Sequence, residues 1–161
     1  MSDNINNNKI DSVLFVCMGN ICRSPSAEAV FRQKAFEYGI DVTIDSAGTL
    51  GAHQGEQPDP RAQKAGCERG YNFKGIRARK VLVEDFGQFS LILAMDTDNM
   101  KNLLAMAPEE HHHKVRLFLD YSENFVEQEV PDPYYGGSRG FELVLDLIED
   151  ASEGLLRQLQ R

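Results

Sequence analysis

A short apolar run that leads at once into a polar turn and a helix start limits the folds open to this chain. The strand-like run Ser12–Cys17 ends at a cysteine, and Ser24-Pro25 begins a helical pattern seven residues later. Serine followed by proline is typical of a helix N-cap with proline at the first helical position. A buried strand that passes through so short a turn into a helix predicts the first strand–helix unit of an α/β fold.

The turn has the composition of an anion-binding loop. Gly19 and Asn20 tolerate left-handed backbone geometry, which directs successive backbone N–H groups into one concavity. The helix N-terminus adds partial positive charge, and the planar guanidinium of Arg23 can hold two oxygens of a tetrahedral oxyanion. Cys17 begins the loop, where such a field favours its reactive thiolate form. The segment alone also fits a core cysteine beside a surface arginine.

Strand-like and helix-like patterns alternate along the rest of the chain, which predicts a parallel sheet with helices on both faces. The later strands are expected at Asp41–Ser46, Ser90–Ala94 and Lys114–Tyr121. The helices are expected at Ser24–Tyr38, Asp59–Gly70, Asp96–Met106 and Gly140–Gln160, with a single turn at Glu84–Gln88. Ligands bind beyond the carboxyl ends of the strands in open α/β sheets. The fold therefore places a binding site at the loop after the first strand.

Length, charge and cysteine content narrow the class of protein. The 161 residues fit one domain, expected at residues 10–161, behind a disordered polar tail at residues 1–9. The net charge of −8 argues against nucleic-acid binding, and no apolar stretch approaches a membrane span. The chain shows no signal-peptide core and has three cysteines, two of them in one loop. These features favour the reducing cytoplasm.

A second unusual segment lies at Pro131–Gly137. Two prolines stiffen the backbone around Asp132, and Tyr134 and Tyr135 follow. Exposed tyrosines could form a wall for a flat ligand. Asp132 could protonate a leaving group if it lay over the anion loop. Taken alone, the segment equally fits an Asp-Pro turn that leads into the last helix.

Together the two segments supply the parts needed for phosphomonoester hydrolysis. Cys17 is a candidate nucleophile, Arg23 a phosphate clamp and Asp132 a general acid for the leaving group. Ser24 could hydrogen-bond the sulfur and ease its departure when water hydrolyses the phosphoenzyme.

These residues resemble the low-molecular-weight protein tyrosine phosphatases, in particular those of bacterial type. The matching motifs are Cys17–Ala29, Asp45–Thr49, Asp59–Ala62, Ala94–Asp96 and Asp132–Gly136. The resemblance implies a three-layer, flavodoxin-like α/β fold with a four-stranded parallel sheet of order 2-1-3-4. It also implies hydrolysis of phosphotyrosine in proteins, and of small aryl phosphates, through a cysteinyl-phosphate, without metal or cofactor.

The resemblance assigns roles to individual positions. It implies that Cys17 is the nucleophile, that Arg23 binds phosphate and that Asp132 is the general acid. The implied phosphate-binding loop and its supports are Met18, Gly19, Asn20, Ile21, Cys22, Ser24 and Ser46. The implied substrate cleft comprises Ile21, Ala52, His53, Tyr134 and Tyr135.

Two cleft positions bear on specificity. Many bacterial relatives carry tryptophan or tyrosine where this chain has Ala52, so one cleft wall is expected to be reduced, with His53 replacing it in part. A threonine at the position of Ile21 marks arginine-phosphate specificity in some relatives. Isoleucine therefore favours phosphotyrosine.

The other cysteines and the histidines have separate interpretations. Cys22 is expected to form a reversible disulfide with Cys17, partly from the family, the alternative being a small residue that packs the loop. Cys67 lies on a helical pattern and is expected in the core. Three consecutive histidines, His111–His113, offer poor ligand geometry and are expected in a solvated loop. Asp96 is expected to cap the helix that follows it.

Two other functions use the same loop. An arsenate reductase needs a relay of further cysteines, and only Cys67 lies outside the loop. A phosphotyrosine-binding module without turnover would not need Cys17, Arg23 and Asp132 together. The expected partner is a phosphotyrosine protein, such as the tyrosine autokinases that bacterial relatives often oppose. The expected oligomeric state is a monomer or weak dimer.

Overall fold

The computed structural model describes residues 9–133 and 137–160. Its strands are β1 (Ser12–Cys17), β2 (Thr43–Gly48), β3 (Leu91–Ala94) and β4 (Val115–Leu117). They form one parallel sheet of order β2-β1-β3-β4, which confirms the predicted topology. β1 pairs with β2 over its full length, so that Cys17 lies opposite Gly48 at the carboxyl end.

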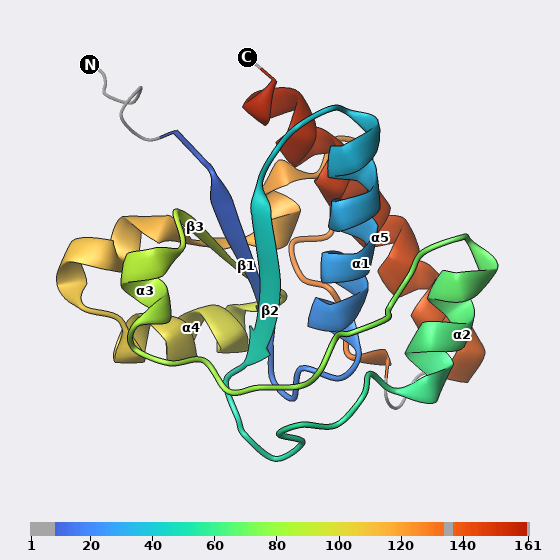
Figure 1. The fold of residues 1–161 in the computed structure, drawn as a ribbon, viewed down its shortest axis with the longest axis horizontal. Helices are drawn as coiled ribbons and strands as arrows, with labels where there is room; N and C mark the ends of the chain where they lie inside the picture. The colour runs from blue at the N-terminus through green and yellow to red at the C-terminus, as the bar shows by residue number, and fades with distance from the viewer. Residues whose placement is uncertain (1–8, 134–136, 161) are drawn as a thin grey trace.

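Helices cover both faces of the sheet. They are α1 (Arg23–Glu37), α2 (Pro60–Glu68), α3 (Asp85–Gln88), α4 (Thr97–Met106) and α5 (Gly137–Leu159), with 3-10 helices η2 (Glu109–Lys114) and η3 (Phe118–Tyr121). Figure 1 shows α1, α2 and α5 on one side and α3 and α4 on the other. Within the described residues, no helix is long and apolar enough to cross a membrane. The three-layer α/β architecture is the one predicted.

The central strand β1 is buried on both faces, which explains its continuous apolar run. Val13 and Phe15 belong to the core formed with α1 and α5, whereas Leu14 and Val16 belong to the core formed with α3 and α4. All four strands run in the same direction, so the loops from β1 to α1 and from β2 to α2 leave the sheet at the same edge (lower part of Figure 1).

The start of α1 differs from the prediction. The helix begins at Arg23, Cys22 occupies the N-cap position, and no side chain caps the helix. Ser24 is therefore not the N-cap and Pro25 is not the first helical residue. The Ser24 hydroxyl lies inside the preceding loop, where it contacts the Cys17 sulfur at 3.0 Å.

The fourth strand is shorter than predicted. Only Val115–Leu117 pairs with β3, and the expected second half of the strand forms η3. Phe118 remains fully buried because its ring packs edge-on against Phe15, with centroids 5.0 Å apart. The core contact, rather than strand alternation, accounts for the apolar residues there. The second strand is shifted by two residues, from Asp41–Ser46 to Thr43–Gly48.

Two smaller expectations were also wrong. Cys67 is exposed, because α2 buries the face that carries Ala62, Ala65 and Gly66. The three histidines lie in η2 rather than in an irregular loop, although they remain partly exposed. No group of three His, Cys, Asp or Glu side chains in the described parts of the chain could hold a metal ion.

Candidate active site

The loop between β1 and α1 is held by the segment that follows β2. The N–H groups of Thr49 and Leu50 donate to the carbonyl oxygens of Cys17 and Met18, at 3.0 and 2.9 Å. A Cβ on Gly48 would lie 2.6 Å from the Met18 carbonyl oxygen, so only glycine fits there. A trans peptide directs its C=O and the next N–H to opposite sides. The N–H groups that follow these carbonyls therefore point away from the β2 segment.

Asn20 gives the loop its sharp turn. Among the described residues it is the only non-glycine residue with positive φ, at 57°. Asparagine tolerates this conformation better than most residue types. The turn brings the Asn20 backbone N–H to 3.3 Å from the Cys17 sulfur, to which it donates.

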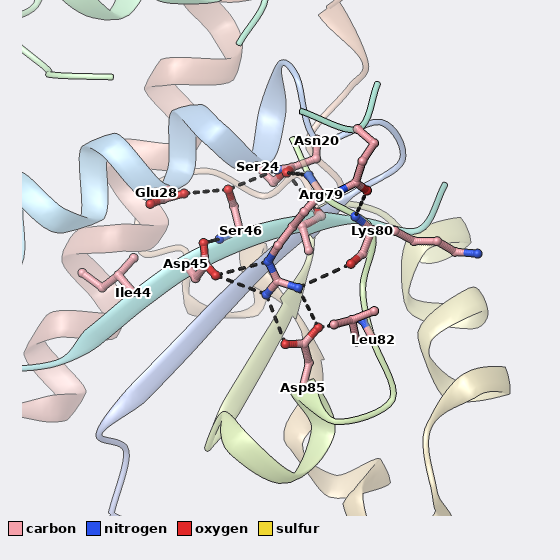
Figure 2. A network of polar contacts seen from close by, with 12 residues as sticks. Asn20, Ser24, Glu28, Ile44, Asp45, Ser46, Arg79, Lys80, Leu82 and Asp85 are labelled. Carbon is pink, nitrogen blue, oxygen red and sulfur yellow. Dashed lines mark hydrogen bonds and ion pairs between the residues drawn. The ribbon is translucent and has the colours of Figure 1, made fainter. Parts of the chain in front are cut away.

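The Cys17 sulfur lies in a polar environment although its residue is only 3% exposed. Ser24 Oγ lies 3.0 Å from it, and Asn20 Nδ2 donates to Ser24 Oγ at 2.8 Å. Asn20 Nδ2 also donates to Ser46 Oγ at 3.1 Å, and Ser46 donates to Glu28 at 2.6 Å (Figure 2). Hydrogen bonds donated to sulfur favour the thiolate, the nucleophilic form of cysteine.

Arg23 is buried and held by two segments that are distant in the sequence. Its Nη1 donates to Asp96 Oδ2 at 2.7 Å and to the Val130 carbonyl oxygen at 2.9 Å. Burial lowers the pKa of the guanidinium, but the negative charges of Cys17 and Asp96 outweigh this and raise it above its usual value. Asp96 also accepts from the Asn99 N–H, which confirms it as the cap of α4.

A cleft of about 270 Å³ opens over the loop. Its lining residues are Cys17, Met18, Gly19, Ile21, Cys22, Arg23, His53 and Asp132. The exposed carboxyl group of Asp132, from the segment before α5, thus shares a cleft with the Cys17 thiol and the Arg23 guanidinium. The Val130 N–H anchors this segment by donating to the Met95 carbonyl oxygen at 2.8 Å.

The residues predicted for the substrate cleft lie in different places in the structure. His53 lies against Gly19, and its Nδ1 is 3.1 Å from a carboxylate oxygen of Glu56. Ala52 is exposed and does not line the cleft as the described residues form it. Tyr134 and Tyr135 lie outside the described residues.

The second cysteine of the loop differs from Cys17 in its environment. Cys22 is 7% exposed and lines the cleft. Burial, together with the negative charges of Asp59, Cys17 and Asp132, raises the pKa of its thiol to about 12. Cys22 is therefore a neutral thiol beside the candidate nucleophile.

Three charged residues around the loop, outside the cleft itself, were not identified from the sequence. Glu28 is buried, accepts from Ser46 and is paired with Arg32 at 2.6 Å. The role of Glu28 could have been recognised from the sequence. It lies one helical turn after Ser24 on a face of the helix expected to be buried, where a carboxylate needs hydrogen-bond partners. Arg79 and Asp85 had no comparable signal, since their partners lie in other elements.

Comparisons with known proteins agree with this geometry. The profile of the low molecular weight phosphotyrosine protein phosphatase family matches residues 12–161. A Synechocystis protein that bears the family's name is 51% identical over 150 residues, 91% of this chain and 95% of that protein. A crystal structure of the protein tyrosine phosphatase of Entamoeba histolytica, with Hepes in the active site, is 44% identical with a TM-score of 0.90, covering 93% of this chain and 97% of that one. The crystal structure of YfkJ from Bacillus subtilis is 42% identical with a TM-score of 0.88, covering 94% and 95%. This chain therefore belongs to the low molecular weight phosphotyrosine protein phosphatase family.

Proposed function

We propose that this protein hydrolyses phosphotyrosine in proteins, and small aryl phosphates, through a covalent cysteinyl-phosphate. The observation that carries the proposal is the convergence of Cys17, Arg23 and Asp132 on one cleft. Cysteine-dependent phosphotyrosine hydrolysis is also the activity of the family to which the chain belongs.

In the first step the Cys17 thiolate attacks phosphorus while the bond to the phenolic oxygen breaks. The loop N–H groups and Arg23 stabilise the charge on the phosphoryl oxygens. Arg23 Nη1 is engaged by Asp96 and Val130, and its Nε and Nη2 have no partner among the described residues, so they can bind phosphate. Asp132, in its acid form, donates its proton to the departing phenolate.

In the second step water hydrolyses the phosphoenzyme. The Asp132 carboxylate takes a proton from the water as its oxygen attacks phosphorus. The sulfur–phosphorus bond breaks and the Cys17 thiolate leaves with the help of the Ser24 hydroxyl, 3.0 Å away. Inorganic phosphate then departs.

The decisive test follows phenol release from an aryl phosphate in the presence of EDTA. We expect a rapid burst of one equivalent of phenol per enzyme, followed by steady turnover, because the phosphoenzyme forms before it is hydrolysed. Phosphate capture without turnover would instead identify a binding module. Arsenate-dependent thiol oxidation without ester hydrolysis would identify a reductase.

We also propose that the nucleophile is oxidised reversibly, with Cys22 as the second cysteine of the resulting disulfide. The Cys17 thiolate attacks peroxide to give a sulfenic acid and hydroxide, and the Cys22 thiol attacks that sulfur to give a disulfide and water. Both residues line the same cleft. We expect peroxide to inactivate the enzyme and a thiol reductant to restore it, measured as residual phosphatase activity. If a Cys22→Ala variant recovers as completely as the unmutated enzyme, Cys22 has no protective role.

We propose that the substrates are tyrosine-phosphorylated proteins of the cytoplasm, and specifically a bacterial tyrosine autokinase. The enzyme is expected to act as a monomer or weak dimer. Retention of such a kinase from lysate of the source cell by the inactive Cys17→Ser variant would support this partner, and its absence from the retained phosphoproteins would exclude it.

A further inference from the structure

An ionic cluster lies at the edge of the sheet, outside the cleft. Arg79 donates from Nη1 and Nη2 to the two carboxylate oxygens of Asp85, at 2.9 and 3.1 Å, and from Nε to Asp45 at 3.2 Å (Figure 2). Asp85 is 4% exposed and also accepts from the Leu82 N–H at 2.7 Å. Paired N–H groups on one carboxylate fix the guanidinium in both position and direction.

The backbone of the same arginine contacts the phosphate-binding loop. The Arg79 N–H donates to Asn20 Oδ1 at 3.0 Å, and the Arg79 carbonyl oxygen accepts from the Gly48 N–H at 2.8 Å. Arg79 thus connects the ionic cluster to the residue that shapes the loop.

This backbone contact determines which way the Asn20 carboxamide faces. A carboxamide has one accepting oxygen and one nitrogen with two protons. With Oδ1 facing the Arg79 N–H, Nδ2 faces Ser24 and Ser46, to which it donates at 2.8 and 3.1 Å. In the flipped orientation Asn20 Nδ2 would face the Arg79 N–H, and two donors would oppose each other. The Arg79 N–H therefore excludes the flipped orientation.

The direction of the Asn20 amide in turn determines the proton position at Ser24. Because Ser24 Oγ accepts from Asn20, its own proton must point elsewhere. The Cys17 sulfur is 3.0 Å away and the Ala47 carbonyl oxygen 3.4 Å away, so the sulfur is the nearer acceptor. Ser46 donates its proton to Glu28 instead, at 2.6 Å.

We infer that Arg79 and Asp85 are positioning residues for the nucleophile. Their ion pair holds the Arg79 N–H on Asn20, and Asn20 holds Ser24 as a hydrogen-bond donor to the Cys17 thiolate. The catalytic consequence rests on the proposed function, since the thiolate attacks in the first step and leaves in the second. The arrangement at the sulfur rests on the contacts alone.

The rival interpretation is that the ionic cluster only stabilises the fold. Arg69 provides a matched control for this interpretation, because it forms a similar cluster elsewhere in the molecule. Arg69 is exposed to the same extent, 24%, and pairs with Glu142, Asp146 and Glu149 at 2.6, 3.1 and 2.9 Å. In the described structure these side-chain contacts all go to α5, away from the Cys17 loop.

The experiment compares Asp85→Asn with Arg69→Met. Two experiments are done on the folded variants. The first gives the pH profile of Cys17 alkylation by iodoacetamide, read on the Cys17 peptide, and the second gives kcat and KM on a phosphotyrosine peptide. For Asp85→Asn we expect the alkylation profile to move up by about one pH unit and kcat to fall about tenfold, with KM within about twofold. Asp85→Glu keeps the carboxylate, so kcat and the alkylation rate at a given pH should return to within about threefold of the unmutated values. Arg69→Met should lower the unfolding midpoint and leave the alkylation profile and kcat unchanged.

A double-mutant cycle decides whether Asp85 acts through Asn20. Asn20→Gly removes the carboxamide and tolerates the positive φ. Adding Asp85→Asn to Asn20→Gly should have little further effect on the alkylation profile, whereas independent effects would add and overturn the inference. An equal shift in Arg69→Met would also overturn it.

If Asp85→Asn does not fold, Arg79→Lys serves in its place, because lysine lacks the planar fork. Alkylation needs no substrate, so a lack of phosphotyrosine turnover in the unmutated protein would contradict the proposed function without affecting this test.

Discussion

Replacing Cys17 by serine is expected to abolish turnover of aryl phosphates while phosphate binding persists. A serine hydroxyl is not ionised at neutral pH, and its phosphate ester would not release the oxygen as readily as a thiolate leaves. The loss should reach about 10⁴-fold or more in kcat. The loop N–H groups and Arg23 are unchanged, so inorganic phosphate should still bind, as measured by calorimetry.

The chain offers a matched control for this substitution. Cys67 is exposed on α2, outside the cleft, so Cys67→Ser should keep full activity. Activity of Cys17→Ser within tenfold of the unmutated enzyme would refute the covalent mechanism. Loss of phosphate binding along with turnover would show that the cysteine holds the loop together rather than attacking phosphorus.

Asp132→Asn is expected to slow the first chemical step by about 10²–10⁴-fold, the usual range for general acid catalysis. An amide cannot donate a proton to the leaving oxygen. The loss should therefore be largest for poor leaving groups and smallest for an activated phenol such as nitrophenol. The measurement is the burst rate over a series of phenyl phosphates with different leaving groups.

Asp120→Asn is the control for this change. Asp120 is an exposed aspartate in η3 and does not line the cleft, so its replacement should leave every burst rate unchanged. An equal loss for all leaving groups in Asp132→Asn would remove Asp132 from the acid role and assign it to substrate binding.

Much of the fold followed from local patterns. The run Ser12–Cys17 is buried on both faces, and such a strand can be recognised in a sequence as a continuous apolar segment. Gly39 follows the C-cap of α1 with a φ of 69°, a conformation that glycine adopts without strain and that commonly ends a helix. The errors came where tertiary contacts override local preference: Phe118 packs on Phe15 although its segment leaves the sheet, and Ser24 turns inward to the Cys17 sulfur instead of capping a helix.

The sequence by itself determined the composition of the phosphate-binding loop. Its parts lie within seven residues, so their spacing alone brings the thiol, the turn and the guanidinium together. Only the tertiary structure decided which side chains contact this loop. Asp96 on Arg23, Asp132 over the cleft and Arg79 on Asn20 come from distant segments. Such contacts depend on how strands and helices pack, and no local periodicity encodes them. The loop therefore predicts which chemistry is available, and the packing determines how the nucleophile is held for it.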